Sequence, residues 1–188
     1  MNPMILLKLR PLILIVNLFF SISAIAESKY DEKTKDITRG ELRKFIFSES
    51  MEVLPNPLIL DANGNMVEIG YKEDILIINF WATWCAPCKK EMPSLNSLAK
   101  KMKYEDIRII TIASGRNSKE AIDAFFDDNN LINLKKYRDP RGRIAVKYGV
   151  TALPTTVVIN PKGIEIGRII GDIDWDTTDV RSFFRKLL

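Results

Sequence analysis

Apolar residues fall into short blocks along the chain, and these blocks show one of two kinds of spacing. The predominantly apolar runs at 75–80 and 107–112 are typical of strands that are covered on both faces of a sheet. Apolar positions three and four residues apart at 95–102 and 121–125 indicate amphipathic helices. Strands that alternate with helices in this way predict an α/β fold, with a central mixed β-sheet and helices on both faces.

Turn-forming residues mark the smaller elements around this centre. Asn63-Gly64, between the apolar runs 58–60 and 66–69, predicts a β-hairpin at the N-terminal side of the fold. Thr38 and Glu41 have the spacing of a capping box, so we expect a short helix whose apolar positions are Leu42, Phe45 and Ile46. The remaining expected elements are a helix capped by Ser118, a strand within 131–137, a turn at 139–142, a brief helix that ends at Gly149, strands at 155–159 and 164–170, and a last helix from about Asp176.

The first 26 residues have the form of a secretory signal peptide. Lys8 and Arg10 precede a short apolar core at 12–20, and Ala24-Ile25-Ala26 is a small-x-small cleavage site. A retained membrane anchor is the alternative, but the apolar run is interrupted by Asn17 and is shorter than the roughly 20 residues that span a bilayer. Either way we expect a periplasmic or other extracytoplasmic location, with membrane contact only through this segment if it is not cleaved.

This division leaves one domain of ordinary size. We expect a signal peptide or anchor at 1–26, a charged leader with the short helix at 27–50, and a single domain at 51–188. The formal net charge of +4 falls to +2 on cleavage, because two basic and no acidic residues leave. Basic side chains form no stripe with interleaved aromatic residues, so no nucleic-acid partner is expected.

Two cysteines, Cys85 and Cys88, are the only ones in the chain, which also has no histidine. A structural zinc site needs about four nitrogen or sulfur ligands, so no metal is expected, and nothing in the sequence calls for a bound cofactor. A purely structural disulfide and a pair of buried apolar residues are the remaining alternatives to redox chemistry. Closing so small a loop stabilises a fold little, and Trp84 and Pro87 beside the pair do not suit a merely buried position.

The position of the pair, between a buried strand and a helix, favours thiol–disulfide exchange. Unpaired N–H groups and the helix dipole stabilise a thiolate at a helix N-terminus, so Cys85 is the expected attacking sulfur. Cys88, one turn further in, is the expected resolving sulfur, and Pro87 stiffens the loop between them. Pro154 enters a strand that faces the cysteines and is a candidate for a cis peptide bond. Trp84 is the expected apolar contact for partners, whereas Trp81 and Trp175 are predicted to be packing residues.

These residues resemble the thioredoxin superfamily: Phe80-Trp81-Ala82, Trp84-Cys85, Pro87-Cys88-Lys89, Pro93 and Leu153-Pro154-Thr155. The longer match is to its exported TlpA/ResA-like branch, through Asn79-Phe80-Trp81, the segment 89–93, the leading hairpin and a strand–helix insertion before the proline strand. It covers about residues 54–188. The resemblance implies a thioredoxin-like fold, a nucleophilic Cys85, a resolving Cys88 and a cis Pro154 beside them. We expect Trp84, Pro87 and Leu153 to contact the substrate.

One position departs from cytosolic thioredoxins, which have a buried aspartate six residues before the first cysteine. Here that residue is Asn79, whose amide cannot act as a base at neutral pH. The nearest replacement is Glu91, three residues after Cys88, and the branch has an active-site glutamate at this spacing. We hypothesise that Glu91 is partly buried, has a raised pKa and takes the proton of Cys88. The alternative is an exposed glutamate that the helix dipole favours.

The resemblance favours a reductant whose clients are proteins with disulfides. Cysteines that must be reduced before they take haem or copper, as in maturation of c-type cytochromes or copper oxidases, are the expected clients. An upstream thiol donor in the membrane would then keep the pair reduced, because exported cysteines tend to be oxidised. A disulfide oxidant or isomerase is the nearest alternative, and a non-enzymatic Cu(I) chaperone that uses the cysteine pair is the alternative from another class.

Overall fold

The structure, a computed structural model, describes residues 39–188. The predicted signal peptide, most of the predicted leader and Thr38 of the capping box lie outside the described residues. Among the helices at 39–188, none is both long enough and apolar enough to cross a membrane.

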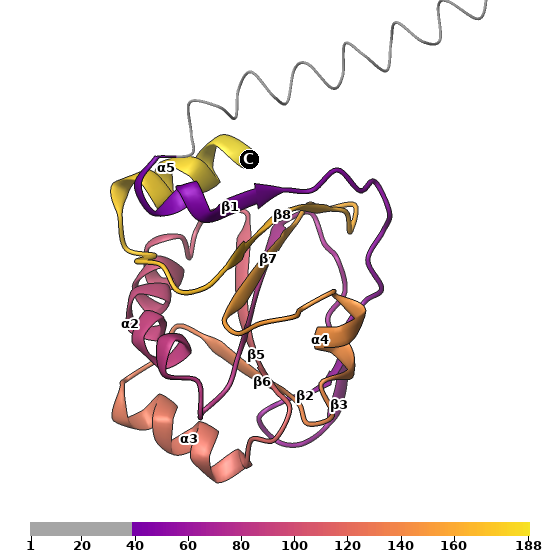
Figure 1. Ribbon diagram of the computed structural model, residues 1–188, viewed down its shortest axis with the longest axis vertical. Coiled ribbons are helices and arrows are strands. Elements are labelled where there is room, and N and C mark those ends of the chain that lie inside the picture. The colour runs from indigo at the N-terminus through magenta and orange to yellow at the C-terminus, as the bar shows by residue number, and fades with distance from the viewer. Residues whose placement is uncertain (1–38) are drawn as a thin grey trace, which may run out of the picture. The chain divides into compact units, whose positions relative to one another are not determined.

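One eight-stranded mixed sheet organises this part of the chain (Figure 1). Its order is β1-β8-β7-β4-β5-β6-β2-β3, in which β4 and β5 are parallel, as are β5 and β6, and all other neighbours are antiparallel. The strands are β1 (Phe45–Phe47), β2 (Leu58–Leu60), β3 (Met66–Glu68), β4 (Ile75–Trp81), β5 (Ile107–Ser114), β6 (Lys135–Asp139), β7 (Thr155–Ile159) and β8 (Glu165–Ile170). The predicted α/β class and mixed sheet are therefore confirmed.

Helices cover both faces of the sheet, as predicted. They are the 3₁₀ helix η1 (Gly40–Lys44) and the α-helices α2 (Ala86–Lys101), α3 (Lys119–Asp128), α4 (Arg143–Lys147) and α5 (Thr178–Leu187). In Figure 1, α2 and α3 lie on one side of the central strands and α4 lies on the other. Side chains of Ser118 and Thr177 accept backbone N–H groups at the starts of α3 and α5, which satisfies donors that a helix leaves unpaired.

Strand β4 is buried along its whole length and divides the core in two. One of its faces belongs to an apolar cluster shared with α4, which includes Leu76, Ile78, Phe80, Ile110, Ile112, Ile144 and Tyr148. Because side chains alternate along a strand, Asn79 and Trp81 point to the opposite face. There the Trp81 ring lies 5.3 Å from that of Phe125 in α3, and Asn79 meets Glu91 of α2. The buried polar residues thus lie on the α2 side of the sheet.

The predicted hairpin is present as β2 and β3. Asp61 fixes its turn, because one carboxylate oxygen accepts the N–H groups of Asn63 and Asn65 at 2.8 Å each. Gly64 has φ +87°, a left-handed conformation that glycine adopts without strain. The predicted strand at 131–137 is displaced and runs from Lys135 to Asp139. Leu131 lies in the loop before this strand and is buried there. It is apolar because it packs into the core, not because it belongs to a strand.

The N-terminal helix is shorter than predicted. It ends at Lys44, and Phe45 and Ile46, expected as its apolar positions, belong to strand β1. Its N-cap is Arg39, whose side chain makes no capping bond. The cause is tertiary pairing: Phe45 lies opposite Ile169 of β8, and its ring packs 4.8 Å from that of Phe183 in α5. Part of the segment predicted as a leader therefore forms an edge of the sheet.

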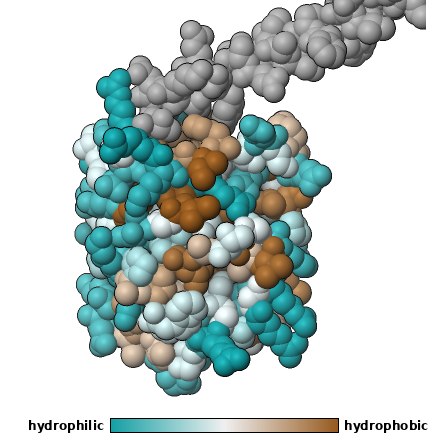
Figure 2. Space-filling view, in the orientation of Figure 1, coloured by the Kyte–Doolittle hydropathy of each residue, from teal (hydrophilic) through white to brown (hydrophobic). Residues whose placement is uncertain are grey.

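Large apolar side chains on the surface do not form one continuous face in the orientation of Figure 1. Figure 2 shows them as separate small groups among hydrophilic residues. Scattered exposed apolar residues of this kind are ordinary for a folded domain.

Close packing between β1 and β8 predicts that Gly167 tolerates no side chain. A Cβ there would lie 2.4 Å from the carbonyl oxygen of Ile46 and 2.5 Å from the Phe45 ring. Since a backbone atom would have to move, Gly167→Ala should lower the free energy of unfolding by about 1–3 kcal/mol in chemical denaturation. Gly70→Ala, where a Cβ would meet nothing within 4 Å, is the control and should not destabilise. Equal losses in the two variants would contradict the pairing of β1.

Candidate active site

Cys85 is the N-cap residue of α2 and lies four residues after the end of β4. Its N–H donates to the carbonyl oxygen of Ala82 at 3.1 Å, which closes the connection between strand and helix. Its sulfur accepts the N–H of Cys88 at 3.3 Å, and the two sulfurs are joined in a disulfide. Pro87 stands in the first turn of α2, where the N–H that proline lacks would have no helical partner. The predicted placement at a helix N-terminus is thus found.

The two cysteines differ in burial in the predicted order. Cys88 has no exposed surface, whereas Cys85 is 6% exposed and its neighbour Trp84 is 65% exposed. A partner approaching from solvent therefore meets Trp84 and Cys85 before Cys88. This arrangement allows exchange to begin at Cys85 and to be completed from the interior.

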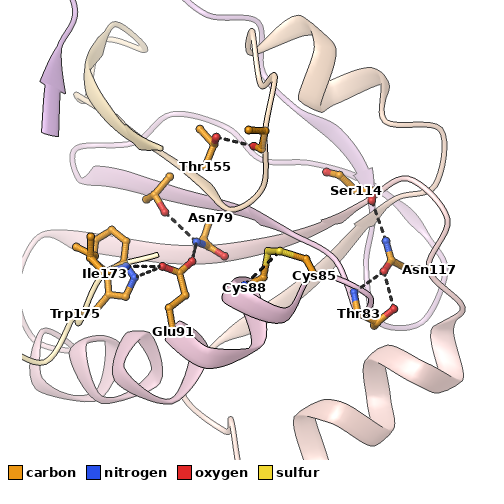
Figure 3. Close-up of a disulfide and its surroundings, with 12 residues drawn as sticks. Asn79, Thr83, Cys85, Cys88, Glu91, Ser114, Asn117, Thr155, Ile173 and Trp175 are labelled. Atoms are coloured by element: carbon orange, nitrogen blue, oxygen red, sulfur yellow. Dashed lines mark hydrogen bonds between the residues drawn. A yellow bond between two sulfur atoms is a disulfide. The ribbon is translucent and has the colours of Figure 1, made fainter. Parts of the chain in front are cut away.

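Asn117 of the β5–α3 connection holds the loop that carries the pair. Its Oδ1 accepts the N–H of Thr83 at 2.8 Å and the Thr83 hydroxyl at 2.9 Å, and its Nδ2 donates to the carbonyl oxygen of Ser114 (Figure 3). The sequence lies here between an expected strand and the helix capped by Ser118, where we predicted no contact. An asparagine in a turn carries no signal for a partner 34 residues away, so this contact was missed.

Pro154 lies at the same end of the sheet as the disulfide. The Leu153–Pro154 peptide bond is cis, as the sequence suggested. Thr155 is paired with Phe80 in antiparallel strands, so Pro154 comes next to the end of β4 that leads to Cys85. Leu153 and Trp84 line one open hollow of about 310 Å³, whose other residues are Ser114, Gly115, Ala145, Val150, Thr151 and Ala152. Pro87 is exposed but does not line it.

Glu91 is buried, with 2% of its surface exposed, and both of its carboxylate oxygens are held. Oε1 accepts Nδ2 of Asn79 at 2.8 Å. Oε2 accepts the indole N–H of Trp175 at 3.0 Å and the backbone N–H of Ile173 at 3.3 Å. Figure 3 shows this carboxylate between Trp175 and Asn79, on the side of α2 that carries Cys88. The alternative of an exposed first-turn glutamate is therefore wrong.

Burial sets the charge state of this carboxyl group. Loss of solvation raises the pKa of Glu91 from 4.5 to about 7, against hydrogen bonds from Trp175, Asn79 and Ile173 that lower it. The negative charge of Asp172 adds to the rise. A group with a pKa near neutrality is partly protonated and partly ionised at pH 7, so it can both take and release a proton there.

Trp175 was predicted as a packing residue and is more than that. It has no exposed surface, but its indole N–H is one of the three donors to Glu91. The two residues are 84 positions apart in the sequence, and no periodic pattern links them. The only hint is a tryptophan within a polar, acidic segment, Asp172-Ile173-Asp174-Trp175-Asp176.

Within residues 39–188 there is no group of three or more histidine, cysteine, aspartate or glutamate side chains placed to hold a metal ion.

Comparison with known proteins assigns the family. The profile of the AhpC/TSA family matches residues 52–164, which is more than half of the chain. The chain belongs to the AhpC/TSA family. Within this family, the chain is similar to "Thiol-disulfide oxidoreductase ResA" of Bacillus thuringiensis subsp. konkukian, with 34% identity over 140 residues, 68% of this chain and 75% of the relative.

ResA of Bacillus subtilis is also 34% identical, over 118 residues that cover 62% of this chain and 65% of the relative, just under two thirds of its length. Among solved structures, StoA from Bacillus subtilis aligns with a TM-score of 0.59 over 72% of this chain and 98% of that one, at 23% identity. That level of identity supports the fold alone. The predicted thioredoxin-like fold and the predicted similarity to ResA-like thiol–disulfide oxidoreductases are therefore confirmed for this domain.

The raised pKa of Glu91 predicts a pH-dependent loss of stability. The folded protein binds the Glu91 proton up to about pH 7 and the unfolded chain only up to about 4.5, so stability should fall as pH rises through this window. The difference amounts to about 3 kcal/mol, so the free energy of unfolding of Glu91→Gln relative to the wild type should rise by about that much between pH 4 and pH 8. Denaturation of the oxidised proteins across this range measures it. Glu52→Gln, at an exposed position, is the control, and equal pH dependence in all three proteins would contradict the raised pKa.

Proposed function

We propose that the protein reduces disulfides of client proteins outside the cytosol by dithiol–disulfide exchange. The observation that carries this proposal is the buried carboxylate of Glu91. It lies three residues after Cys88 on α2, the helix whose N-terminus holds the disulfide. It supplies a proton acceptor in the interior, where Cys88 has no contact with solvent. Cys85, Cys88 and Glu91 are the residues to which we assign the chemistry, with Pro154 beside them.

The first step begins from the reduced protein. The N-terminus of α2 stabilises Cys85 as a thiolate, and the N–H of Cys88 already points at its sulfur. This thiolate attacks one sulfur of a client disulfide. A bond forms between Cys85 and that sulfur, the bond between the two client sulfurs breaks, and the electron pair leaves on the second client sulfur, which takes a proton from solvent.

The second step releases the client. Cys88 gives its proton to the carboxylate of Glu91, and the resulting thiolate attacks the sulfur of Cys85. The bond between Cys85 and the client breaks, and the client sulfur that was joined to Cys85 leaves as a thiolate and is protonated. The disulfide of Cys85 and Cys88 forms, which is the state of the structure. The client has gained two electrons. A thiol donor in the membrane must return two electrons and two protons before the next cycle.

The carboxylate also supports reduction as the direction. Strong oxidants of this chemistry owe their potential to a stabilised reduced form, in which a thiolate is favoured. A buried negative charge near the pair acts against such a thiolate, since like charges repel strongly where solvent is absent. A reducing potential is the expected consequence.

For the clients, we infer cysteine pairs that must be reduced before they bind haem or copper, as in maturation of c-type cytochromes or copper oxidases. Support comes from the similarity to relatives named ResA and from the signal-like segment at 1–26. Trp84 and Leu153, which line the hollow beside Cys85, are the contacts that we assign to a client segment. The periplasm or another extracytoplasmic space is the proposed location, with an inner-membrane anchor if residues 1–26 are retained.

The direction of transfer can be measured as an equilibrium with glutathione. We expect the pair to be far more reducing than the roughly −120 mV of the oxidant DsbA, and the reduced protein to reduce a model disulfide. Cys85→Ser should abolish that activity, because the attacking sulfur is lost. A potential near −120 mV would overturn the reductase proposal, and undiminished reduction by Cys85→Ser would contradict the assigned attacking sulfur. Tight Cu(I) binding without any reduction of the model disulfide would favour the copper chaperone instead.

Variants that block the second step should reveal the clients. In Cys88→Ser the mixed disulfide between Cys85 and the client cannot resolve and should accumulate in the exporting cell. In Glu91→Gln it should accumulate transiently, with client release slowed by about 100-fold or more if the carboxylate acts as a general base. Mass spectrometry of the trapped complexes identifies the clients, with Glu52→Gln as the control. Unchanged release in Glu91→Gln would refute the role of Glu91, and clients without haem- or copper-binding cysteines would refute the proposed pathway.

A further inference from the structure

The side chain of Asn79 is fully buried, yet only one end of its amide is paired. Nδ2 donates to Oε1 of Glu91 at 2.8 Å and to the hydroxyl of Thr156 at 2.9 Å. Oδ1 has no hydrogen-bond partner among residues 39–188. Figure 3 shows this oxygen at the end of the amide that points away from Glu91 and toward the disulfide. Buried carbonyl groups are almost always paired, so the free oxygen of Asn79 requires an explanation.

The charge of Glu91 determines which end of the amide faces the cysteines. An ionised carboxylate only accepts hydrogen bonds, so the NH₂ group of Asn79 has to face it. If the Asn79 amide were rotated by half a turn, Oδ1 would face the carboxylate oxygen, and two acceptors would repel each other. Trp175 and Ile173 hold the other carboxylate oxygen, which keeps Glu91 in place. The unpaired carbonyl on the side of Cys88 is therefore a consequence of the network around Glu91.

Reduction of the disulfide can supply the missing donor. In the disulfide neither sulfur carries a hydrogen. Reduction breaks the S–S bond, so the two sulfurs must separate to a non-bonded distance, and Cys88 acquires a thiol hydrogen. Because Cys88 has no exposed surface, this hydrogen has to find an acceptor inside the protein. Oδ1 of Asn79 is a free acceptor on that side of the helix.

We propose that the thiol of Cys88 donates a hydrogen bond to Oδ1 of Asn79 in the reduced protein. Asn79 is then a positioning residue: one end of its amide holds Glu91, the other holds the sulfur whose proton Glu91 takes. The amide itself neither gains nor loses a proton. The inference rests on the proposed function in one respect, that Cys88 is the interior thiol of the exchange reaction.

A hydrogen bond that exists only in the reduced state has two consequences. It keeps Cys88 protonated and oriented until a mixed disulfide forms on Cys85, because a bond to the neutral form disfavours ionisation. It also stabilises the dithiol relative to the disulfide. This second effect raises the reduction potential of the cysteine pair and so partly offsets the lowering by the negative charge of Glu91.

Infrared spectroscopy of the S–H stretch tests the contact directly. Cys85→Ala leaves a single thiol, that of Cys88, in an otherwise unchanged chain. We expect its band at the lower frequency of a hydrogen-bonded thiol, relative to a simple thiol dissolved in an apolar solvent. Adding Asn79→Leu should move the band to the unbonded position, whereas adding Thr156→Val, which removes the other partner of the same amide, should leave it in place.

An unbonded band in Cys85→Ala alone overturns the proposal, even if Asn79→Leu does not fold. So does a bonded band that Asn79→Leu leaves unmoved. The band reports the contact whether or not the protein reduces clients and whether or not Glu91 takes the proton, so this inference and the proposed function fail separately.

The equilibrium with glutathione gives an independent measure on the full chain with both cysteines. The comparison is made in Glu91→Gln, because Asn79 also donates to Glu91 and its loss would otherwise change the charge at position 91. In that background, loss of a weak hydrogen bond made only in the dithiol should shift the equilibrium two- to fivefold toward the disulfide when Asn79→Leu is added, which corresponds to a potential about 9–21 mV more negative. Adding Thr156→Val instead should leave it unchanged, and a shift toward the dithiol on adding Asn79→Leu would contradict the proposal.

Discussion

The burial of one carboxylate is the constraint on which the site depends. Glu91 lies in the interior against β4 and the segment that precedes α5, and its charge is tolerable there only because three donors surround it. Those donors come from parts of the chain that are far apart in sequence. Asn79 lies in the central strand, and Ile173 and Trp175 follow the last strand. A residue on the helix that carries the disulfide is thereby tied to the centre and to the end of the fold, and the same burial that costs free energy brings its pKa close to neutrality.

The network also gives a physical reason for an asparagine in place of a buried aspartate. Two carboxylates at positions 79 and 91 would lie within hydrogen-bond distance in a site without solvent, and both could not be ionised. An amide removes that conflict, since one end donates to Glu91 and the other remains free to accept. In the proposed mechanism, proton handling thus lies on the helix, at Glu91, and not on the strand. The residue type at position 79 therefore depends on the residue type at position 91, and the two should be considered together.

Local signals in the sequence predicted most of the fold. Asn63-Gly64 located the hairpin, Ser118 located the start of α3, and the apolar run at 75–80 located the buried strand, because in each case neighbouring residues determine the structure. The same reasoning failed at Phe45 and Ile46, where spacing suggested a helix but pairing with β8 produced a strand. It also failed at Trp175, because a hydrogen bond to a residue 84 positions away leaves no periodic trace. What local patterns could not predict was set by long-range pairing.

This distinction separates the two halves of the chemistry. The reactivity of Cys85 follows from its place at the N-terminus of α2, which four consecutive residues largely determine, so a short motif is enough to predict it. The environment of Cys88 depends instead on β4, α2 and the segment before α5 coming together correctly. In the proposed mechanism, attack on a client disulfide is therefore a local property of the helix start, whereas resolution depends on the whole fold. Differences in direction and client choice among proteins with the same cysteine motif are expected to arise in that second, non-local half.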